Sequence, residues 1–271
     1  MNKIVRRQEL APSLKLFEVE APMIARRAEP GQFVILRVHQ EGERIPLTIA
    51  DFNREAGTIT LVFQEVGHTT RRLGLLQVGQ GILDLLGPLG EATEHPPGKN
   101  AVCIGGGVGV APVYPEAKGL KKHGYQVTSI IGARSSDLLF FEDEMTAVSE
   151  KLYIATDDGS KGEKGLVTTV LDRLIAQGQP IDFVIAIGPI PMMKAVAELT
   201  RKHNIKTIVS LNSIMVDGTG MCGGCRVTVG DEVKFTCVDG PAFDAHLLDF
   251  DEQMRRLDMY QGLEKNCGGK R

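Results

Sequence analysis

Short apolar runs follow one another at close intervals through the first 97 residues. Four runs are rich in apolar and β-branched residues, and Pro, Gly or Asn separates them. They are 14–19, 33–38, 58–63 and 82–86. One stretch with a helical pattern, 68–76, interrupts the series. Because short, closely spaced strands are typical of small closed sheets, the pattern predicts an antiparallel β-barrel over residues 1–97.

The pattern changes between residues 98 and 211. Five runs are apolar without alternation, which indicates strands buried on both faces. They are 101–104, 127–131, 152–155, 183–187 and 207–211. Stretches with helical spacing lie between them, at 112–123, 141–149, 166–176 and 191–203. Pro112 and Pro191 fit first helical turns, and Gly124 fits a helix end. This alternation predicts an α/β domain with a doubly wound parallel sheet.

Residues 212–271 form a third segment, with a glycine- and cysteine-rich loop, a polar helical stretch at 246–257 and a tail at 264–271. The whole length of 271 residues suits about two domains of ordinary size, with the loop appended.

Composition and charge exclude several classes of protein. The net charge of −3 gives no basic surface for nucleic acid or an anionic membrane. No apolar run reaches the roughly 18 residues of a transmembrane helix, and residues 1–10 are too polar for a secretory signal. Three of the five cysteines fall within sixteen residues, which favours a metal site over a disulfide framework. We therefore expect a cytoplasmic protein.

A glycine-rich loop follows the first strand of the predicted α/β domain. Glycines let a pyrophosphate approach the backbone, and the start of the next helix presents free N–H groups to it. The spacing is not the strict G-x-G-x-x-G, so a tight turn without a ligand fits equally well. The candidate dinucleotide-binding residues in this loop are Gly105, Gly106, Gly107 and Gly109.

Three more loops follow predicted parallel strands, and ligands bind at the carboxyl ends of such strands. Arg134 follows the second strand, where no acidic residue is placed to bind a ribose 2′-hydroxyl. It could meet a 2′-phosphate or be a solvated loop residue, so NAD and NADP both stay open. Asp157 and Asp158 follow the third strand, and Gly188 and Pro189 follow the fourth. Ordinary turns would also explain each of these residues taken singly.

Two segments of the predicted barrel combine cations, hydroxyls and turn residues. Arg44 could pair with a phosphate, and Thr48 could face a ligand while Leu47 faces the core. Residues 67–70 offer N–H groups and hydroxyls at a helix start. A surface charge and a strand filler would explain Arg44 and Thr48 as well. The candidate binding residues here are Arg44, Pro46, Leu47, Thr48, Gly67, Thr69 and Thr70.

The cysteine loop contains Asp217, Cys222, Cys225 and Cys237, spaced x4, x2 and x11. The spacing is close to the C-x4-C-x2-C…C pattern of plant-type 2Fe–2S clusters, with Asp in the first position. A zinc site and a loop without metal are the alternatives. Zinc sites usually combine two C-x-x-C motifs, and only one is present here. Glycines around the cysteines favour the cluster, because they let the backbone wrap around it.

The two remaining cysteines lie outside this loop. Cys103 lies within a strand and fits a small buried hydrophobe, and Cys267 lies in the tail as a further thiol to consider.

The order of these motifs resembles the ferredoxin–NADP reductase superfamily. The order is R-x-P-L-T at 44–48, G-x-T-T at 67–70, G-P-L-G at 87–90, G-G-G-V-G-V-A-P at 105–112 and G-A-R-S at 132–135. The resemblance implies an FAD-binding barrel, in which 44–48 and 67–70 contact the flavin and its phosphates, and a nicotinamide-binding α/β domain. With the cysteine loop, the chain is similar to the electron-transfer subunit of dihydroorotate dehydrogenase. It is more similar to the small subunit of NADH-dependent reduced ferredoxin:NADP oxidoreductases, in which an Asp ligand like Asp217 is expected.

The resemblance implies a redox subunit without a catalytic acid, base or nucleophile, because the cofactors supply the chemistry. FAD would exchange hydride with NAD(H) and pass single electrons through the 2Fe–2S cluster. A larger partner with a second FAD, 4Fe–4S clusters and the NADP(H) site would complete an electron-bifurcating enzyme that uses ferredoxin. An electron-transfer subunit of an NAD-dependent dihydroorotate dehydrogenase is the alternative. A non-enzymatic redox sensor or zinc-stabilised binding module is the alternative of a different class.

Overall fold

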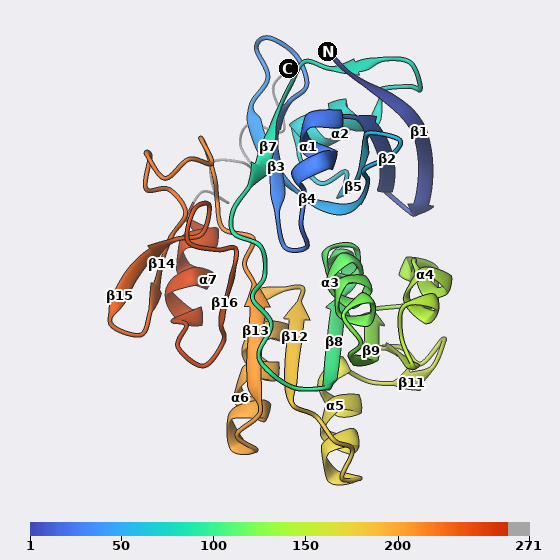
Figure 1. Cartoon of the computed structure of the whole chain (residues 1–271), viewed down its shortest axis with the longest axis vertical. Coiled ribbons are helices and arrows are strands. Elements are labelled where there is room, and N and C mark those ends of the chain that lie inside the picture. The colour runs from blue at the N-terminus through green and yellow to red at the C-terminus, as the bar shows by residue number, and fades with distance from the viewer. Residues whose placement is uncertain (260–271) are drawn as a thin grey trace.

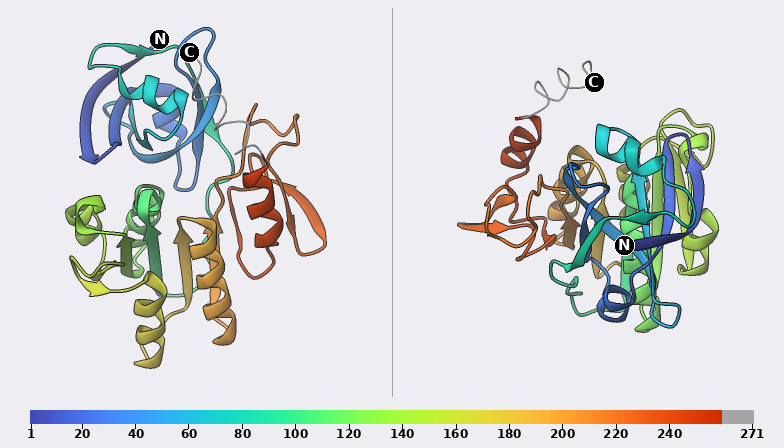
Figure 2. Two further views of the ribbon diagram at one scale, coloured as in Figure 1. Left: turned by 180° about the vertical axis from the view of Figure 1, so that it is seen from behind. Right: turned by 90° about the horizontal axis from the view of Figure 1, so that it is seen from above.

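The computed structural model describes residues 1–259, which form a barrel, an α/β domain below it and a small C-terminal module beside both (Figures 1 and 2). Cys267 and the tail lie outside the described residues.

The first part is a seven-stranded antiparallel sheet that curls into a nearly closed barrel, as predicted. Its strands are paired in the order β6-β1-β2-β5-β4-β3-β7, and Phe17 and Phe63 pack edge to face inside it with ring centroids 5.0 Å apart. The elements are β1 (Asn2–Ala11), β2 (Leu14–Glu20), α1 (Pro22–Arg27), β3 (Phe33–Arg37), β4 (Arg44–Asn53), β5 (Thr58–Gln64), α2 (His68–Gly74), β6 (Gly81–Ile82) and β7 (Asp84–Leu89).

Strand β1 is absent from the predicted runs because few of its residues are buried. Within β1, Ile4 and Ala11 are the buried residues, and the register shifts twice along its pairing with β2. A long strand with so few inward side chains leaves no alternation of apolar and polar residues for sequence analysis to detect.

The second part is a sheet with the order β11-β10-β9-β8-β12-β13-β16, parallel except for β16. Helices α3 and α4 pack on one face and α5 and α6 on the other, which confirms the doubly wound arrangement. The elements are β8 (Asn100–Gly106), α3 (Val110–Lys122), β9 (Gln126–Ala133), α4 (Glu142–Ala147), β10 (Lys151–Thr156), β11 (Glu163–Lys164), α5 (Val167–Ala176), β12 (Phe183–Ile187), α6 (Ile190–Lys202) and β13 (Lys206–Ser210); single 3₁₀ turns cover Gly107–Gly109 and Ser136–Leu138.

The C-terminal module contains the hairpin β14 (Arg226–Val229) and β15 (Glu232–Phe235), then β16 (Ala242–Asp244) and α7 (Phe250–Asp258). Strand β16 pairs antiparallel with β13, so the module completes the sheet of the second part. The helix expected from residue 246 begins only at Phe250. The Asp249 side chain accepts the Glu252 N–H at 2.8 Å and caps the helix there.

Helix α3 joins the barrel to the α/β domain. Lys118 of α3 forms an ion pair with Asp51 of β4 at 2.8 Å. The fully buried Glu116 accepts a hydrogen bond from Thr93 Oγ1 at 2.6 Å and lies 3.0 Å from His95 Nε2, both in the connection between β7 and β8. None of the helices in residues 1–259 is long and apolar enough to cross a membrane.

Candidate cofactor-binding site

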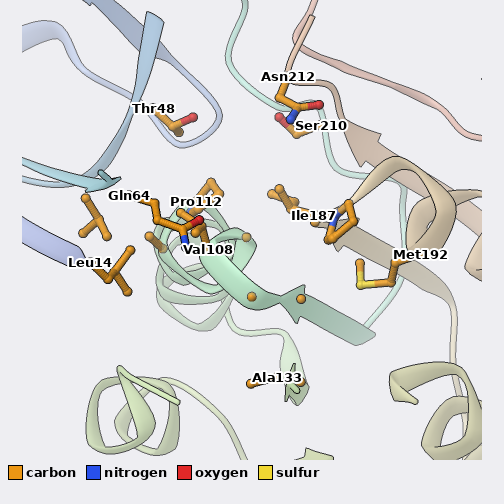
Figure 3. Close-up of a pocket in the computed structure, with 18 of the residues that line it drawn as sticks. Leu14, Thr48, Gln64, Val108, Pro112, Ala133, Ile187, Met192, Ser210 and Asn212 are labelled. Atoms are coloured by element: carbon orange, nitrogen blue, oxygen red, sulfur yellow. The ribbon is translucent and has the colours of Figure 1, made fainter. Parts of the chain in front are cut away.

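A cavity of about 1030 Å³ lies between the barrel and the α/β domain. Figure 3 shows Thr48 and Gln64 of the barrel and Ile187 and Ser210 of the parallel sheet around the same space. Its volume and its mixed apolar and hydroxyl lining suit large planar cofactors.

The glycine-rich loop borders this cavity at the point where the strand order reverses. Strand β8 pairs with β9 on one side and β12 on the other, so the loops after β8 and β12 diverge at their carboxyl ends. Gly109 faces the end of β12, and a Cβ there would overlap the carbonyl oxygen of Ile187. A side chain at residue 109 would therefore force the two strand ends apart.

Eleven of the sixteen predicted cofactor-binding residues line the cavity. They come from both domains, although they are as far as 143 positions apart in the chain (from 46 to 189). They are Pro46, Leu47, Thr48, Thr70, Gly106, Gly107, Gly109, Arg134, Asp157, Gly188 and Pro189.

Five predicted residues lie outside the lining. Arg44 and Gly67 are exposed, and the buried Thr69 donates its hydroxyl hydrogen to Glu43 Oε2 at 2.8 Å. Gly105 is buried beneath Val110 at the start of α3. Asp158 accepts hydrogen bonds from the hydroxyl and N–H of Ser160, which hold the pKa of its carboxyl below the ordinary value.

The sequence analysis did not single out Ser210 and Asn212, which also line the cavity. Ser210 ends β13 and Asn212 lies two residues beyond it, and the exposed Asn212 turns its amide toward this space (Figure 3). The rule that ligands bind at strand carboxyl ends would have identified them if it had been applied to this strand.

The cysteine loop holds two thiols inside the protein and one outside. Cys225 and Cys237 are 1% and 2% exposed, with their Sγ atoms 3.2 Å apart, whereas Cys222 is exposed. The Cys237 N–H points at Cys225 Sγ and the Gly224 N–H at Cys222 Sγ, each at 3.4 Å. Burial and the neighbouring Cys225 raise the pKa of Cys237 to about 12, so metal binding must displace protons from these thiols.

Asp217 lies beside Cys222 but its carboxylate is engaged with the loop backbone. One oxygen accepts the Thr219 N–H at 2.7 Å and the other the Cys222 N–H at 2.8 Å. The Thr219 bond is the main cause that lowers the pKa of this carboxyl. Across residues 1–259, no three His, Cys, Asp or Glu side chains already stand together as a metal-binding group.

The donor set nevertheless fits an iron–sulfur site. Two thiolates on one tetrahedral metal with bonds of about 2.3 Å lie roughly 3.7 Å apart, and the Cys225–Cys237 pair is already close to that separation. Gly218 has a φ of +75°, and a Cβ there would meet Ile35 of β3 at 2.7 Å. Glycine thus lets the loop press against the barrel.

The cavity and the thiol pair share a wall. Phe33 of β3 and Met215 line the cavity, and both belong to the apolar cluster that contains Cys225 and Cys237. The cavity and the two buried cysteines therefore border the same apolar cluster.

Comparisons with known proteins agree with this arrangement. A model of an oxidoreductase NAD-binding domain matches residues 103–198, and a model of the iron–sulfur cluster binding domain of dihydroorotate dehydrogenase B matches residues 212–249. A Thermotoga maritima protein named as a homolog of the dihydroorotate dehydrogenase B electron transfer subunit is 45% identical over 98% of this chain and 93% of its own. The electron transfer subunit of Bacillus caldolyticus is 36% identical over 82% of this chain and 88% of its own.

The chain belongs to the family of dihydroorotate dehydrogenase B electron-transfer subunits and their homologues. Within this family's fold, a chain of the NADH-dependent reduced ferredoxin–NADP oxidoreductase matches with a TM-score of 0.93 and 44% identity, over 98% of this chain and 95% of that one. A ferredoxin NADP⁺ reductase from Neisseria gonorrhoeae shares the fold at a TM-score of 0.62 and 19% identity, over 74% and 89% of the two chains. The family and the fold confirm an oxidoreductase subunit with FAD, NAD(H) and 2Fe–2S as its cofactors.

Proposed function

We propose that this chain is the electron-transfer flavoprotein subunit of an NADH-dependent reduced ferredoxin:NADP oxidoreductase. When bound, FAD would exchange a hydride with NAD(H) and single electrons with the cluster. In the complete enzyme, flavin-based bifurcation would couple NADH, ferredoxin and NADP. The 0.93 TM-score to a chain of such an enzyme supports this assignment over the family's dihydroorotate dehydrogenases.

The single observation that carries the proposal is the shared wall of Phe33 and Met215. It places a cofactor-sized cavity and the thiol pair on the same apolar cluster, which supports a subunit that converts hydride transfer into single-electron transfer. A zinc-stabilised binding module would need no cavity at this place.

The residues divide between the cofactors by the domain that supplies them. Pro46, Leu47, Thr48 and Thr70 of the barrel would hold FAD, while the loops after β8, β9, β10 and β12 would receive NAD(H). Arg44, Gly67, Thr69, Gly105 and Asp158 remain candidates for cofactor atoms beyond the cavity or for support of the lining. We assign residues 1–97, 98–211 and 212–271 to the FAD, nicotinamide and cluster parts.

Asp217, Cys222, Cys225 and Cys237 would ligate the cluster. The hydrogen bond from the Cys222 N–H to the Asp217 carboxylate keeps the two residues close together and supports this ligand set. Each of its oxygens accepts one backbone hydrogen bond and keeps a further lone pair that could bind iron.

A larger partner subunit would accept the electrons at the exposed side of the cysteine loop. Three apolar side chains stand directly beside predicted ligands in the sequence and are open to solvent: Val216 at 58%, Met221 at 88% and Val238 at 37%. Exposed apolar groups beside a redox centre suit a covering protein surface. The partner would carry a second FAD, 4Fe–4S clusters and the NADP(H) site. The free thiols in the described part of the chain fit a reducing cytoplasm.

The test is to purify the tagged chain from its native cell with whatever partner it retains. We expect a coloured complex with flavin and iron–sulfur absorption, and NADP reduction that requires both NADH and reduced ferredoxin. A partner that oxidises dihydroorotate would instead establish the family's other role. A colourless chain without flavin would contradict both.

A further inference from the structure

Two arginines bind successive carbonyls in the turn between Cys222 and Cys225. Arg226 Nη1 donates to the Gly223 carbonyl at 3.2 Å, and Arg256 Nη2 of α7 donates to the Gly224 carbonyl at 2.8 Å. Arg226 follows the turn directly, whereas Arg256 lies thirty-two residues beyond Gly224 and is partly buried. The turn is therefore held from outside the loop as well as from within it.

The carbonyl contacts decide where the amides of the turn point. In a trans peptide the C=O of one residue and the N–H of the next point in opposite directions. With the Gly223 carbonyl turned toward Arg226, the Gly224 N–H faces the other way and meets Cys222 Sγ at 3.4 Å. By the same geometry, Arg256 fixes the Gly224–Cys225 peptide so that the Cys225 N–H points away from the guanidinium.

Helix α7 holds the next carbonyl through a chain of hydrogen bonds. Gln253 Nε2 donates to Ser213 Oγ at 2.7 Å, Ser213 Oγ lies 2.9 Å from Thr236 Oγ1, and Thr236 donates to the Cys225 carbonyl at 2.8 Å. Gln253 is 2% exposed and its Oε1 has no partner among the described residues. Burying an unpaired amide oxygen is unfavourable, and an apolar side chain in a purely packing role would avoid this cost.

We propose that Arg256 is a positioning residue of the iron–sulfur site that raises the reduction potential of its cluster. It acts in two ways, by fixing the Gly224–Cys225 peptide, which adjoins the peptide whose N–H meets Cys222 Sγ, and by placing a positive charge at the turn. Hydrogen bonds to sulfur and nearby positive charge both stabilise the reduced, more negative cluster. The inference rests on the proposed function, because it requires the cluster to be bound at this loop.

The experiment is a redox titration of the purified full-length chain with its cofactors, followed by electron paramagnetic resonance. We expect Arg256→Gln to lower the equilibrium constant for one-electron reduction of the cluster about tenfold, which is about 59 mV. Arg255→Gln is the matched control, because it removes the same charge from the exposed neighbouring position on α7. It should change the constant less than twofold. Arg256→Lys should recover part of the shift, since it keeps the charge but not the fork of donors.

Several outcomes would overturn the inference. An unchanged potential in Arg256→Gln, or an equal shift in Arg255→Gln, would show that Arg256 has no specific role. If Arg256→Gln bound no iron, Arg226→Gln would provide the same test on the adjacent carbonyl, and an iron-loaded variant with the wild-type potential would contradict the proposal. A wild-type chain without any cluster signal would instead refute the proposed function itself.

Discussion

The cofactor cavity and the cysteine loop differ in what holds their geometry in place. The cavity is lined at the ends of strands in two sheets, so its geometry comes from backbone ladders and close glycine contacts. The cysteine loop has no regular element between β13 and β14, and glycines 218, 220 and 223 adopt positive φ values. Side chains of a distant helix hold its carbonyls instead.

The difference implies that the two regions can be disrupted separately. Glycine substitutions should damage the cavity by steric overlap, and loss of thiols should damage the loop through metal binding. The shared residues Phe33 and Met215 connect the regions without contributing ligands to the cluster.

The largest expected effect comes from Cys225→Ala. Removing a buried thiol of the pair leaves the cluster one ligand short, so we expect loss of nearly all cluster iron, measured by iron analysis and visible absorption. Reduction of the flavin by NADH should persist, since the cavity is unchanged. Cys103→Ala is the control, because this buried thiol lies in β8 away from the loop and should leave iron content intact. Full iron content in Cys225→Ala would exclude Cys225 as a ligand.

The converse change is Gly109→Val. Its side chain would collide with the end of β12, so we expect the rate of flavin reduction by NADH to fall roughly a hundredfold, with cluster iron retained. Stopped-flow absorbance measures the rate. Gly124→Ala is the control, because an added Cβ there meets no neighbouring atom. Its φ of +84° strains the substituted backbone, whereas Gly109 has a φ of −61°, so a fall in rate shared by both variants would come from lost stability. A wild-type rate in Gly109→Val would mean that NAD(H) binds elsewhere.

A smaller effect is expected for Asp217→Cys. A thiolate donates more electron density to iron than a carboxylate, so the reduction equilibrium of the cluster should fall by about tenfold and its paramagnetic resonance spectrum should change. Asp217→Asn separates this role from the turn, because its amide oxygen can still accept one of the two backbone hydrogen bonds. An unchanged spectrum and potential in Asp217→Cys would show that Asp217 is only a turn residue.

The smallest effect concerns His246, which belongs to neither region. Burial is the main cause that lowers the pKa of His246, whose Nε2 lies 3.0 Å from the hydroxyl of Thr200. The unfolded chain therefore binds a proton more readily, so this stabilisation is present above about pH 6.5 and is lost as the pH falls below it. Between pH 7.5 and 5.5 the wild-type unfolding temperature should fall roughly 1–2 °C more than that of His246→Gln. Equal falls would show that His246 does not contribute.

Much of the fold follows from the sequence because its core strands are apolar throughout. All five predicted parallel runs correspond to strands, and β12 was located at its observed bounds, 183–187. Strand β1 escaped prediction because so few of its side chains point inward. The hairpin of β14 and β15 was also not predicted, since its strands are four residues long and only Val227 in them is buried.

The candidate site was predictable where a local motif encodes it. The glycine loop and the segment 46–48 are continuous in sequence and meet in the cavity. The support of the cysteine loop by Arg256 and Gln253 depends on contacts between residues thirty-two and forty positions apart, which no local pattern records.

Strand β16 has a consequence for solubility as well as for architecture. It covers the free side of β13, which would otherwise present unpaired N–H and C=O groups along an apolar edge. An open edge of this kind recruits strands from other chains and promotes aggregation. The segment that carries the cysteines thus also protects the nicotinamide domain from self-association, so a shortened chain that ends after β13 should precipitate even though all its parallel strands remain.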